Sequence, residues 1–215
     1  MKIDVKRFLD LSAMLSDVPG LQIVAPINEH MIKLATDEFN AATFADLFER
    51  QHGFAPGEAV IALMELPTRI ELQWCCGDVQ GELRLHNPDI AIANPIDASY
   101  RDQLGRNMSR FAALDMVSDI AGPFFVLYDP QTVDETGLIL FDGKLSAPLE
   151  LTADSYAEMA ARLWAIDGWQ FLFSTLPTSA PLREALREGF ALVSRHSQDE
   201  RLSEIGAKLA MLRQP

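Results

Sequence analysis

The sequence contains only two cysteines, Cys75 and Cys76, and they are adjacent. Adjacent cysteines rarely bridge each other, because disulfide geometry needs a longer Cα separation than neighbours provide. We therefore interpret them as reduced thiols, as in a cytosolic protein. Long apolar runs are also missing: the longest, Ala59–Met64, is far shorter than the roughly 20 residues that span a bilayer. The start, Met1–Arg7, lacks the apolar core of a secretory signal, so we expect a cytoplasmic location.

Basic residues are scarce. Eighteen Lys and Arg stand against 31 Asp and Glu, which gives a formal net charge of −13 over 215 residues. Phosphate binding needs a basic face, and anionic membrane surfaces attract basic segments. We therefore expect neither nucleic acid nor a membrane as partner. The acidity is concentrated between Phe111 and Ala161, where nine acidic residues are opposed by Lys144 alone.

Motifs for catalysis, metal binding and phosphate binding are missing as well. The four histidines are scattered and no second cysteine pair is present, so we expect no metal site. The sequence has no Gly-x-Ser-x-Gly motif and no glycine-rich loop that opens a helix. One alternative stays open, in which Asp129, Asp134 and Glu135 are paired carboxylates of a small hydrolase. A solvated turn is the preferred interpretation, and we expect neither a cofactor nor catalysis.

Runs of alternating and continuous apolar residues predict an antiparallel sheet. Ile70–Trp74 and Leu83–Leu85 alternate with polar residues and are joined by Gly77–Gly81, a pattern typical of a hairpin. Phe124–Tyr128 and Gly137–Phe141 are mostly apolar, which is typical of strands that are buried on both faces.

Helical spacing occurs on both sides of these strands. The clearest helix is expected from Tyr156 to Trp164, with Thr152 or Ser155 as its N-cap and Gly168 as a left-handed C-terminal cap. After it, Trp169–Phe173 is predicted to be a last short strand. Three further stretches with helical patterns lie nearer the N-terminus: Ile3–Leu15, Asn28–His52 and Pro56–Leu66.

The C-terminal tail carries two amphipathic stripes, Leu182–Val193 and Leu202–Leu212. We expect them to form a helical pair packed on the same chain, and a dimer seam is the alternative. The predicted fold is therefore α+β, with a mainly antiparallel sheet, helices on one side and this C-terminal pair. The expected parts are an N-terminal helical segment (1–54), an α+β core (55–176) and the tail (177–215), within one compact domain. The oligomeric state is left open.

Several short motifs follow one another in the middle of the chain. In order they are a helix over Pro56–Leu66, a strand ending at Trp74, Gly81-Glu82, an aromatic strand ending in Asp129-Pro130, and a helix start at Asp154-Ser155-Tyr156. This order resembles the SUKH superfamily, which includes SMI/KNR-type glucan-synthesis regulators and many bacterial immunity proteins. The resemblance covers Ala55–Phe173. Pro67-Thr68 replaces the Asn-Gly that usually precedes the first strand of the family.

The SUKH resemblance implies a non-enzymatic binding domain. SUKH immunity proteins bind and block a toxin, frequently a nuclease, whose surface must be basic to hold phosphate. An acidic inhibitor meets such a surface with complementary potential and gains association rate. The alternative is a scaffold or regulator of the SMI/KNR type that assembles through its tail helices. We expect a basic protein partner, such as a toxin, to bind at Asp119, Asp129, Asp134, Glu135 and Asp142. Reversing Asp134 and Glu135 to lysine is expected to leave stability almost unchanged, because exposed loop charges contribute little.

Overall fold

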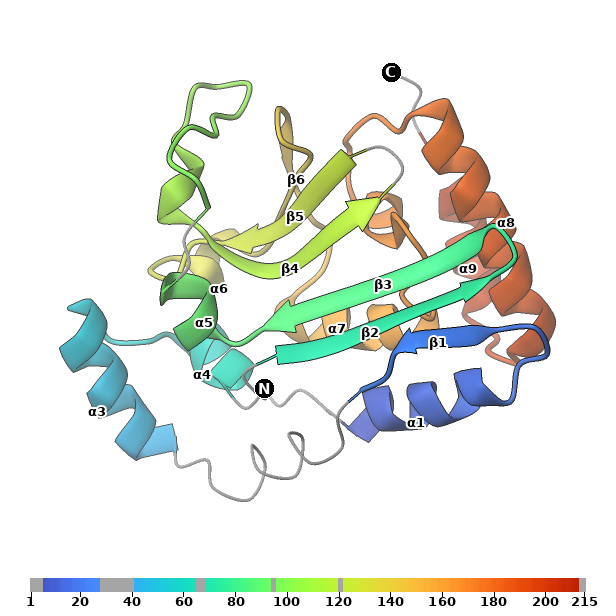
Figure 1. The fold of residues 1–215 in the computed structure, drawn as a ribbon. Helices are drawn as coiled ribbons and strands as arrows, with labels where there is room; N and C mark the ends of the chain where they lie inside the picture. Colours follow the sequence, from blue (N-terminus) through green and yellow to red (C-terminus); the bar gives the residue numbers. More distant parts are fainter. Residues whose placement is uncertain (1–5, 28–40, 65–68, 94–95, 120–121, 213–215) are drawn as a thin grey trace.

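The computed structural model describes residues 6–27, 41–64, 69–93, 96–119 and 122–212 (Figure 1). These residues form an α+β fold around a seven-stranded antiparallel sheet, as the sequence predicts. The strands lie in the sheet in chain order, so each pairs with the strands before and after it in the sequence. They are β1 (Gln22–Ala25), β2 (Arg69–Cys76), β3 (Val79–His86), β4 (Ala112–Asp119), β5 (Gly122–Tyr128), β6 (Ile139–Phe141) and β7 (Ser146–Pro148).

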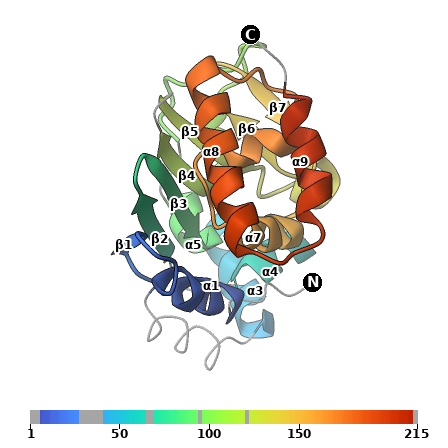
Figure 2. The ribbon, with the colours of Figure 1, turned by 90° about the vertical axis from the view of Figure 1, so that its right-hand side faces the viewer.

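Three helices, α7 (Ala153–Arg162), α8 (Ala180–His196) and α9 (Leu202–Ala210), lie together on one face of the sheet (Figure 2). The expected helix over Asn28–His52 is described only from Ala41, because residues 28–40 lie outside the described part. No helix in the described part of the chain is long and apolar enough to cross a membrane. The helices are α1 (Lys6–Ser16), α3 (Ala41–His52), α4 (Glu58–Met64), α5 (Pro88–Ala93), the 3₁₀ helix η1 (Met108–Arg110), α6 (Val133–Thr136), α7 (Ala153–Arg162), the 3₁₀ helix η2 (Trp169–Phe173), α8 (Ala180–His196) and α9 (Leu202–Ala210).

The main hydrophobic core draws on all three parts of the chain that the sequence suggested. Phe8 of α1, Leu163 after α7 and Leu186 of α8 belong to this core, and none of them is exposed to solvent. The N-terminal part is also less uniform than expected. Besides its helices it contributes β1, which pairs with β2 at the edge of the sheet. The N-terminal helices, the central sheet and the tail therefore share one core.

A second apolar cluster lies on the opposite face of β4, β5 and β6. Phe125 and Leu127 of β5 belong to this cluster, whereas their neighbours Phe124 and Val126 belong to the main core. Because successive side chains of a strand point to opposite faces, β5 is buried on both, which explains its unbroken apolar sequence. The segment 96–111, which includes η1, contributes side chains to this second cluster. Helices thus cover one face, as predicted, and this largely irregular segment covers part of the other.

The β2–β3 hairpin is joined to the chain that follows α7. Trp74 of β2 faces Gly81 of β3, and a Cβ on Gly81 would lie only 2.5 Å from Cε2 of the Trp74 ring. The indole Nε1 of Trp74 donates to the Trp164 carbonyl oxygen (2.7 Å), and the Glu82 amide donates to that of Ala165 (2.9 Å). Trp164 and Ala165 adopt left-handed φ angles of 55° and 52°. The missing side chain at Gly81 therefore leaves room for the indole and for this turn of the chain.

Helix α7 begins as predicted and ends earlier than predicted. Thr152 is the N-cap, and it exchanges hydrogen bonds with Ser155 in a capping box. The helix ends at Arg162, and Gly168, although left-handed (φ 74°), precedes η2 instead of capping α7. The strand predicted over Trp169–Phe173 is wrong, because these five buried residues form η2. The one polar residue of this run, Gln170, is buried as well, so the run has no exposed polar face and its periodicity cannot distinguish the two structures.

The two tail helices, α8 and α9, pack against the sheet and η2 of their own chain. Leu182, Leu186 and Val193 of α8 are buried, as are Leu202 and Ile205 of α9. Helix α8 contacts β3 and α9, and α9 contacts η2. The apolar stripes are therefore used within the chain, which confirms the predicted helical pair and leaves few of their large side chains for a dimer seam.

Candidate functional site

The five acidic residues predicted to bind a partner do not form one cluster. Asp119 ends β4 and pairs with the first residue of β5. Asp142 directly follows the last residue of β6, which pairs with the middle of β5, so Asp142 lies toward that same end of β5. Asp129, Asp134 and Glu135 come after the last residue of β5. Because β5 has seven residues at about 3.3 Å each, its two ends lie about 20 Å apart. The predicted face is thus divided between two ends of one strand.

Two of these carboxylates organise turns. Asp129 accepts a hydrogen bond from the Gln131 amide (3.1 Å), and its other oxygen lies 3.4 Å from the Arg110 guanidinium. Asp142 accepts hydrogen bonds from two amides of the turn between β6 and β7, at 2.9 and 2.7 Å. Aspartate favours turns for this reason, since its side chain can bond the backbone two residues further on. Both residues therefore have a local structural role. The side chains of Asp119 and Glu135 lie outside the described part.

Asp134 of α6 is exposed, yet its carboxylate binds the N-terminus of α4. One oxygen accepts a hydrogen bond from the Ala59 amide (2.8 Å), which is one of the first-turn amides without a partner inside the helix. The carboxylate also occupies the space beside Gly57 that a Cβ would fill. Because Asp134 joins two helices, we expect charge reversal at this position to lower stability, in place of the small effect expected for an exposed loop charge.

We expect Asp134→Ala to lower the free energy of unfolding by about 1 kcal/mol, the usual cost of losing a helix cap. Chemical denaturation measures this loss as a lower midpoint at unchanged slope. Glu188→Ala on α8 is a matched control, since Glu188 is also exposed and should change stability by less than about 0.5 kcal/mol. Equal midpoints for the two variants would show that the contact with Ala59 contributes nothing.

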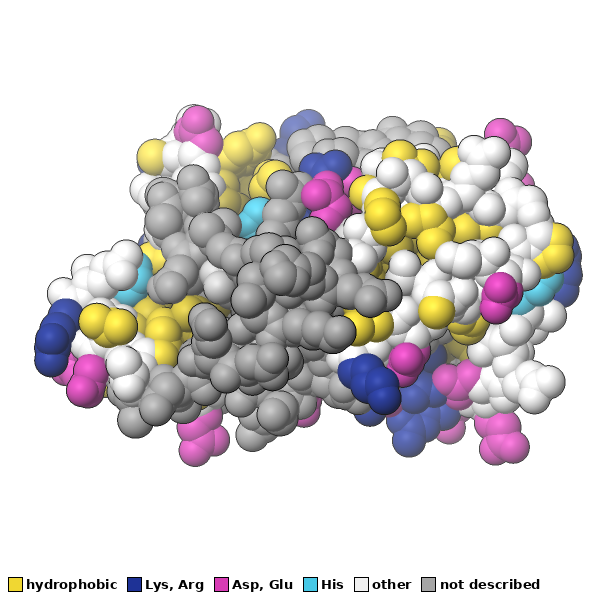
Figure 3. Space-filling view, turned by 60° about the horizontal axis from the view of Figure 1, so that its bottom comes forward, with side chains coloured by type: hydrophobic (Ala, Val, Ile, Leu, Met, Phe, Trp, Pro, Cys, Tyr) yellow, Lys and Arg dark blue, Asp and Glu magenta, His cyan; other side chains and the backbone are white. Residues whose placement is uncertain are grey.

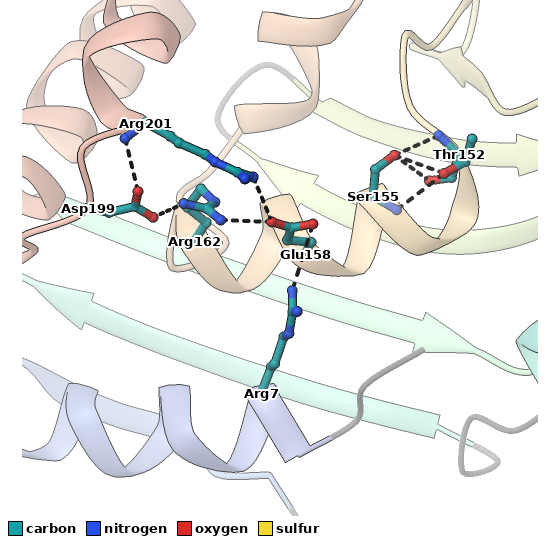
Figure 4. Close-up of polar contacts among 7 residues, drawn as sticks. All are labelled: Arg7, Thr152, Ser155, Glu158, Arg162, Asp199 and Arg201. Carbon is teal, nitrogen blue, oxygen red and sulfur yellow. Dashed lines mark hydrogen bonds and ion pairs between the residues drawn. The ribbon is translucent and has the colours of Figure 1, made fainter. Parts of the chain in front are cut away.

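A denser group of charges surrounds Glu158 of α7 (Figure 4). Its carboxylate lies 2.7 Å from Arg162, one turn later, 3.2 Å from Arg201 and 3.8 Å from Arg7 of α1. Asp199 binds the other end of the Arg162 guanidinium and accepts the Arg201 amide at 3.0 Å. This network connects α1, α7 and the loop between α8 and α9. Only the spacing of Glu158 and Arg162 on one helix could have been recognised in the sequence.

The Glu158 network borders a groove of about 350 Å³ between α1, α7 and the α8–α9 loop. Leu11, Met14 and Trp164 supply apolar lining, and Asp10 adds a further carboxylate. Figure 3, viewed from the underside of Figure 1, shows Lys and Arg side chains beside Asp and Glu side chains at the lower right. This groove is open to solvent, and Leu11 and Trp164 are themselves almost wholly buried beneath it. We call this surface, whose lining includes Asp10, Leu11, Met14, Glu158 and Trp164, the α1–α7 groove.

A second polar cluster is completely buried in the core. Asp115 of β4 accepts hydrogen bonds from the Tyr156 hydroxyl (2.5 Å), the Gln170 amide nitrogen (3.3 Å) and the backbone amides of Arg84 (2.9 Å) and Met116 (2.8 Å). Burial raises the pKa of the Asp115 carboxyl, although these hydrogen bonds oppose the shift. Burial and the neighbouring carboxyl together raise the pKa of Tyr156 well above its usual range. Asp115, Tyr156 and Gln170 are each 0% exposed, so this cluster joins β3, β4, α7 and η2 inside the protein.

No family model, curated protein or solved structure matches this chain. Among the described residues, no three His, Cys, Asp or Glu side chains are grouped in a way that could hold a metal ion. The candidate sites are therefore the acidic groups at the two ends of β5 and the α1–α7 groove.

Proposed function

We propose that this chain is a non-catalytic domain that binds a basic protein, in the manner of a SUKH immunity protein that neutralises a toxin. The observation that carries the proposal is the charge imbalance: −13 overall, with nine acidic residues against Lys144 between Phe111 and Ala161. A field of one sign steers a partner of the opposite sign and raises its association rate. The order of short motifs that resembles the SUKH superfamily supports the same class of function.

The end of β5 near α4 and α6 is the stronger half of the predicted face. Asp129, Asp134 and Glu135 lie there in sequence, and the contact between Asp134 and Ala59 brings the first turn of α4, with the exposed Glu58, beside them. We define these four acidic residues as the acidic corner. Asp119 and Asp142, at the other end of β5, stay predictions for the margin of the interface. Asp129 and Asp134 already bind backbone amides, and the Asp129 side chain is only 13% exposed and paired with Arg110, so these carboxylates suit a structural role at this corner better than the hydrolase alternative.

The test is co-purification of this chain with the products of the genes that neighbour its own, followed by association kinetics at two salt concentrations. The variant Glu58→Gln/Glu135→Gln leaves the Asp134 cap in place and removes two charges. At low salt we expect its association rate to be about three- to tenfold lower, with a weaker salt dependence. The control Glu184→Gln/Glu188→Gln removes two exposed charges from α8 and should change the rate much less.

Three results would count against this proposal. If no neighbouring gene product binds, the immunity function is wrong. If the two double variants associate equally fast at both salt concentrations, the acidic corner is not in the interface. If instead a small substrate is turned over and Asp129→Asn abolishes the turnover, the chain is an enzyme.

A further inference from the structure

The resident partners of Glu158 differ in how firmly they are held. Arg162 lies 2.7 Å from the Glu158 carboxylate, its side chain is only 17% exposed, and it also binds Asp199. Arg201 and Arg7 lie further away, at 3.2 and 3.8 Å, and their side chains are 64% and 49% exposed. Exposed ion pairs contribute little free energy, because water and salt screen them and long side chains lose entropy. Arg7 and Arg201 can therefore be displaced from Glu158 at small cost.

The lining of the α1–α7 groove suits a long cationic side chain. Met14, which is 37% exposed, offers apolar surface for an aliphatic stem beside the largely buried Leu11 and Trp164, while Glu158 and Asp10 offer carboxylates for its charged end. Arginine and lysine commonly bury their stems along apolar surface in this way. Arginine fits Glu158 better than lysine, because its planar guanidinium forms two parallel hydrogen bonds with a carboxylate. Arg162, which already binds Glu158, shows that a guanidinium reaches this carboxylate in the folded protein.

We propose that the α1–α7 groove receives an arginine side chain of the basic partner, which replaces Arg201 and Arg7 at Glu158. This inference rests on the proposed function, since a basic protein supplies the arginine and the net charge of −13 attracts it. Arg201 and Arg7 then act as internal competitors that occupy the carboxylate until the partner arrives. The groove lies on a different part of the chain from the acidic corner, so the two surfaces are tested separately.

The first experiment uses Nα-acetyl-arginine amide as the probe and NMR spectra of the ¹⁵N-labelled full chain as the readout. The expected result is saturable change at the signals of Leu11 and the Trp164 indole. The uncharged isostere Nα-acetyl-citrulline amide should give no such change, because it lacks the charge that Glu158 pairs with. Nα-acetyl-glutamate amide tests the opposite occupant, an anion held by the resident arginines.

Two variants are expected to change the affinity for the arginine probe in opposite directions. Glu158→Gln should weaken binding of the arginine probe at least about fivefold, since the charged acceptor is lost. Arg201→Ala should strengthen it by about two- to fivefold, because the competing ion pair is removed. Matched controls are Glu150→Gln, which removes a carboxylate paired with Lys208, and Arg187→Ala, which removes an exposed arginine paired with Glu184. Both controls should leave the affinity for the probe unchanged.

Each outcome decides the proposal. Absence of binding by the arginine probe, tighter binding of the glutamate probe, or weaker arginine binding in Arg201→Ala would overturn it. A loss in Glu158→Gln alone could come from a damaged fold, but a gain in Arg201→Ala cannot. If neighbouring gene products bind while the arginine probe does not, only the groove inference fails. If the probe binds as expected and no neighbouring gene product does, the groove stands and the immunity function fails.

Discussion

Replacing Gly81 with alanine is expected to lower the free energy of unfolding by about 3 kcal/mol. The new Cβ would lie 2.5 Å from Cε2 of Trp74 and 2.7 Å from the carbonyl oxygen of Ala165. Both neighbours are fully buried, so neither can move without disturbing the core. Any shift of the indole would also break its hydrogen bond to the Trp164 carbonyl.

Denaturant unfolding at constant slope measures this effect. Gly206→Ala in α9 is the control, because the nearest atom to its new Cβ is in the Phe190 ring at 3.3 Å and alanine favours a helix. Its stability should stay within about 1 kcal/mol of the wild type. The double variant Trp74→Phe/Gly81→Ala should be less destabilised than the sum of the single changes, since a smaller ring relieves the clash. Additive losses would mean that Trp74 is not the group that Gly81 accommodates.

Asp115→Ala should cost about 4 kcal/mol, because it leaves several buried donors without an acceptor. Those donors are the Tyr156 hydroxyl and the backbone amides of Arg84 and Met116, while the Gln170 amide nitrogen keeps its 2.9 Å hydrogen bond to Tyr156. Tyr156→Phe removes the hydroxyl that donates to Asp115 and accepts from the Gln170 amide nitrogen (2.9 Å), and it should cost about 1–2 kcal/mol, a graded comparison within the same cluster. The control is Tyr100→Phe, at a partly exposed tyrosine that packs on the second apolar cluster, away from Asp115. It should have little effect on stability. A midpoint for Asp115→Ala close to that of the control would show that water replaces the carboxylate.

The isosteric variant Asp115→Asn tests the direction of the pKa shift. Because the folded-state pKa of Asp115 is raised, the folded protein holds this proton more tightly than the unfolded chain. Its contribution to stability is therefore complete below the unfolded pKa, about 4, and is lost as the pH rises through the folded pKa. The stability of the wild type relative to Asp115→Asn should thus increase as the pH is lowered through this window. The opposite trend would mean that the four hydrogen bonds outweigh burial and lower the pKa.

The strands and helices with one polar face were predictable from the sequence. Ile70–Trp74 and Leu83–Leu85 alternate apolar and polar residues because β2 and β3 each bury one face. Thr152, one of the two expected N-caps, identified the start of α7 for an equally local reason. Such signals depend on residues close in the chain, which is why they survive without knowledge of the fold.

Elements that depend on distant partners were not predictable. Strand β1 has four residues and is defined by its pairing with β2, and β7 has three residues paired with β6. The second cluster needs the segment 96–111 to cross the back of the sheet, which no local pattern indicates. Trp169–Phe173 is buried all round, so its sequence suits a strand as well as η2.

The candidate surfaces were also predictable only in part. The excess of acidic residues was visible in the composition, but the bonds of Asp134 to α4 and of Asp142 to its turn appear only in the fold. The Glu158 network brings together residues from α1, α7 and the loop before α9, and only its Arg162 lies near Glu158 in sequence. The kind of partner that we propose thus comes from the composition, and the candidate surfaces come from the fold.

The order of the strands has a consequence for synthesis on the ribosome. Because the strands lie in the sheet in the order in which they are made, β3 to β7 can each pair with the strand that emerged just before it. Apart from the long connection between β3 and β4, such pairing closes short loops and costs little chain entropy. The first half of β3 is different, since Gly81 is bridged by Ile166, which is translated much later. Most strands of a nascent chain can therefore pair during synthesis. The backbone of β3 at Gly81 lacks its partner until Ile166, which follows α7, has left the exit tunnel.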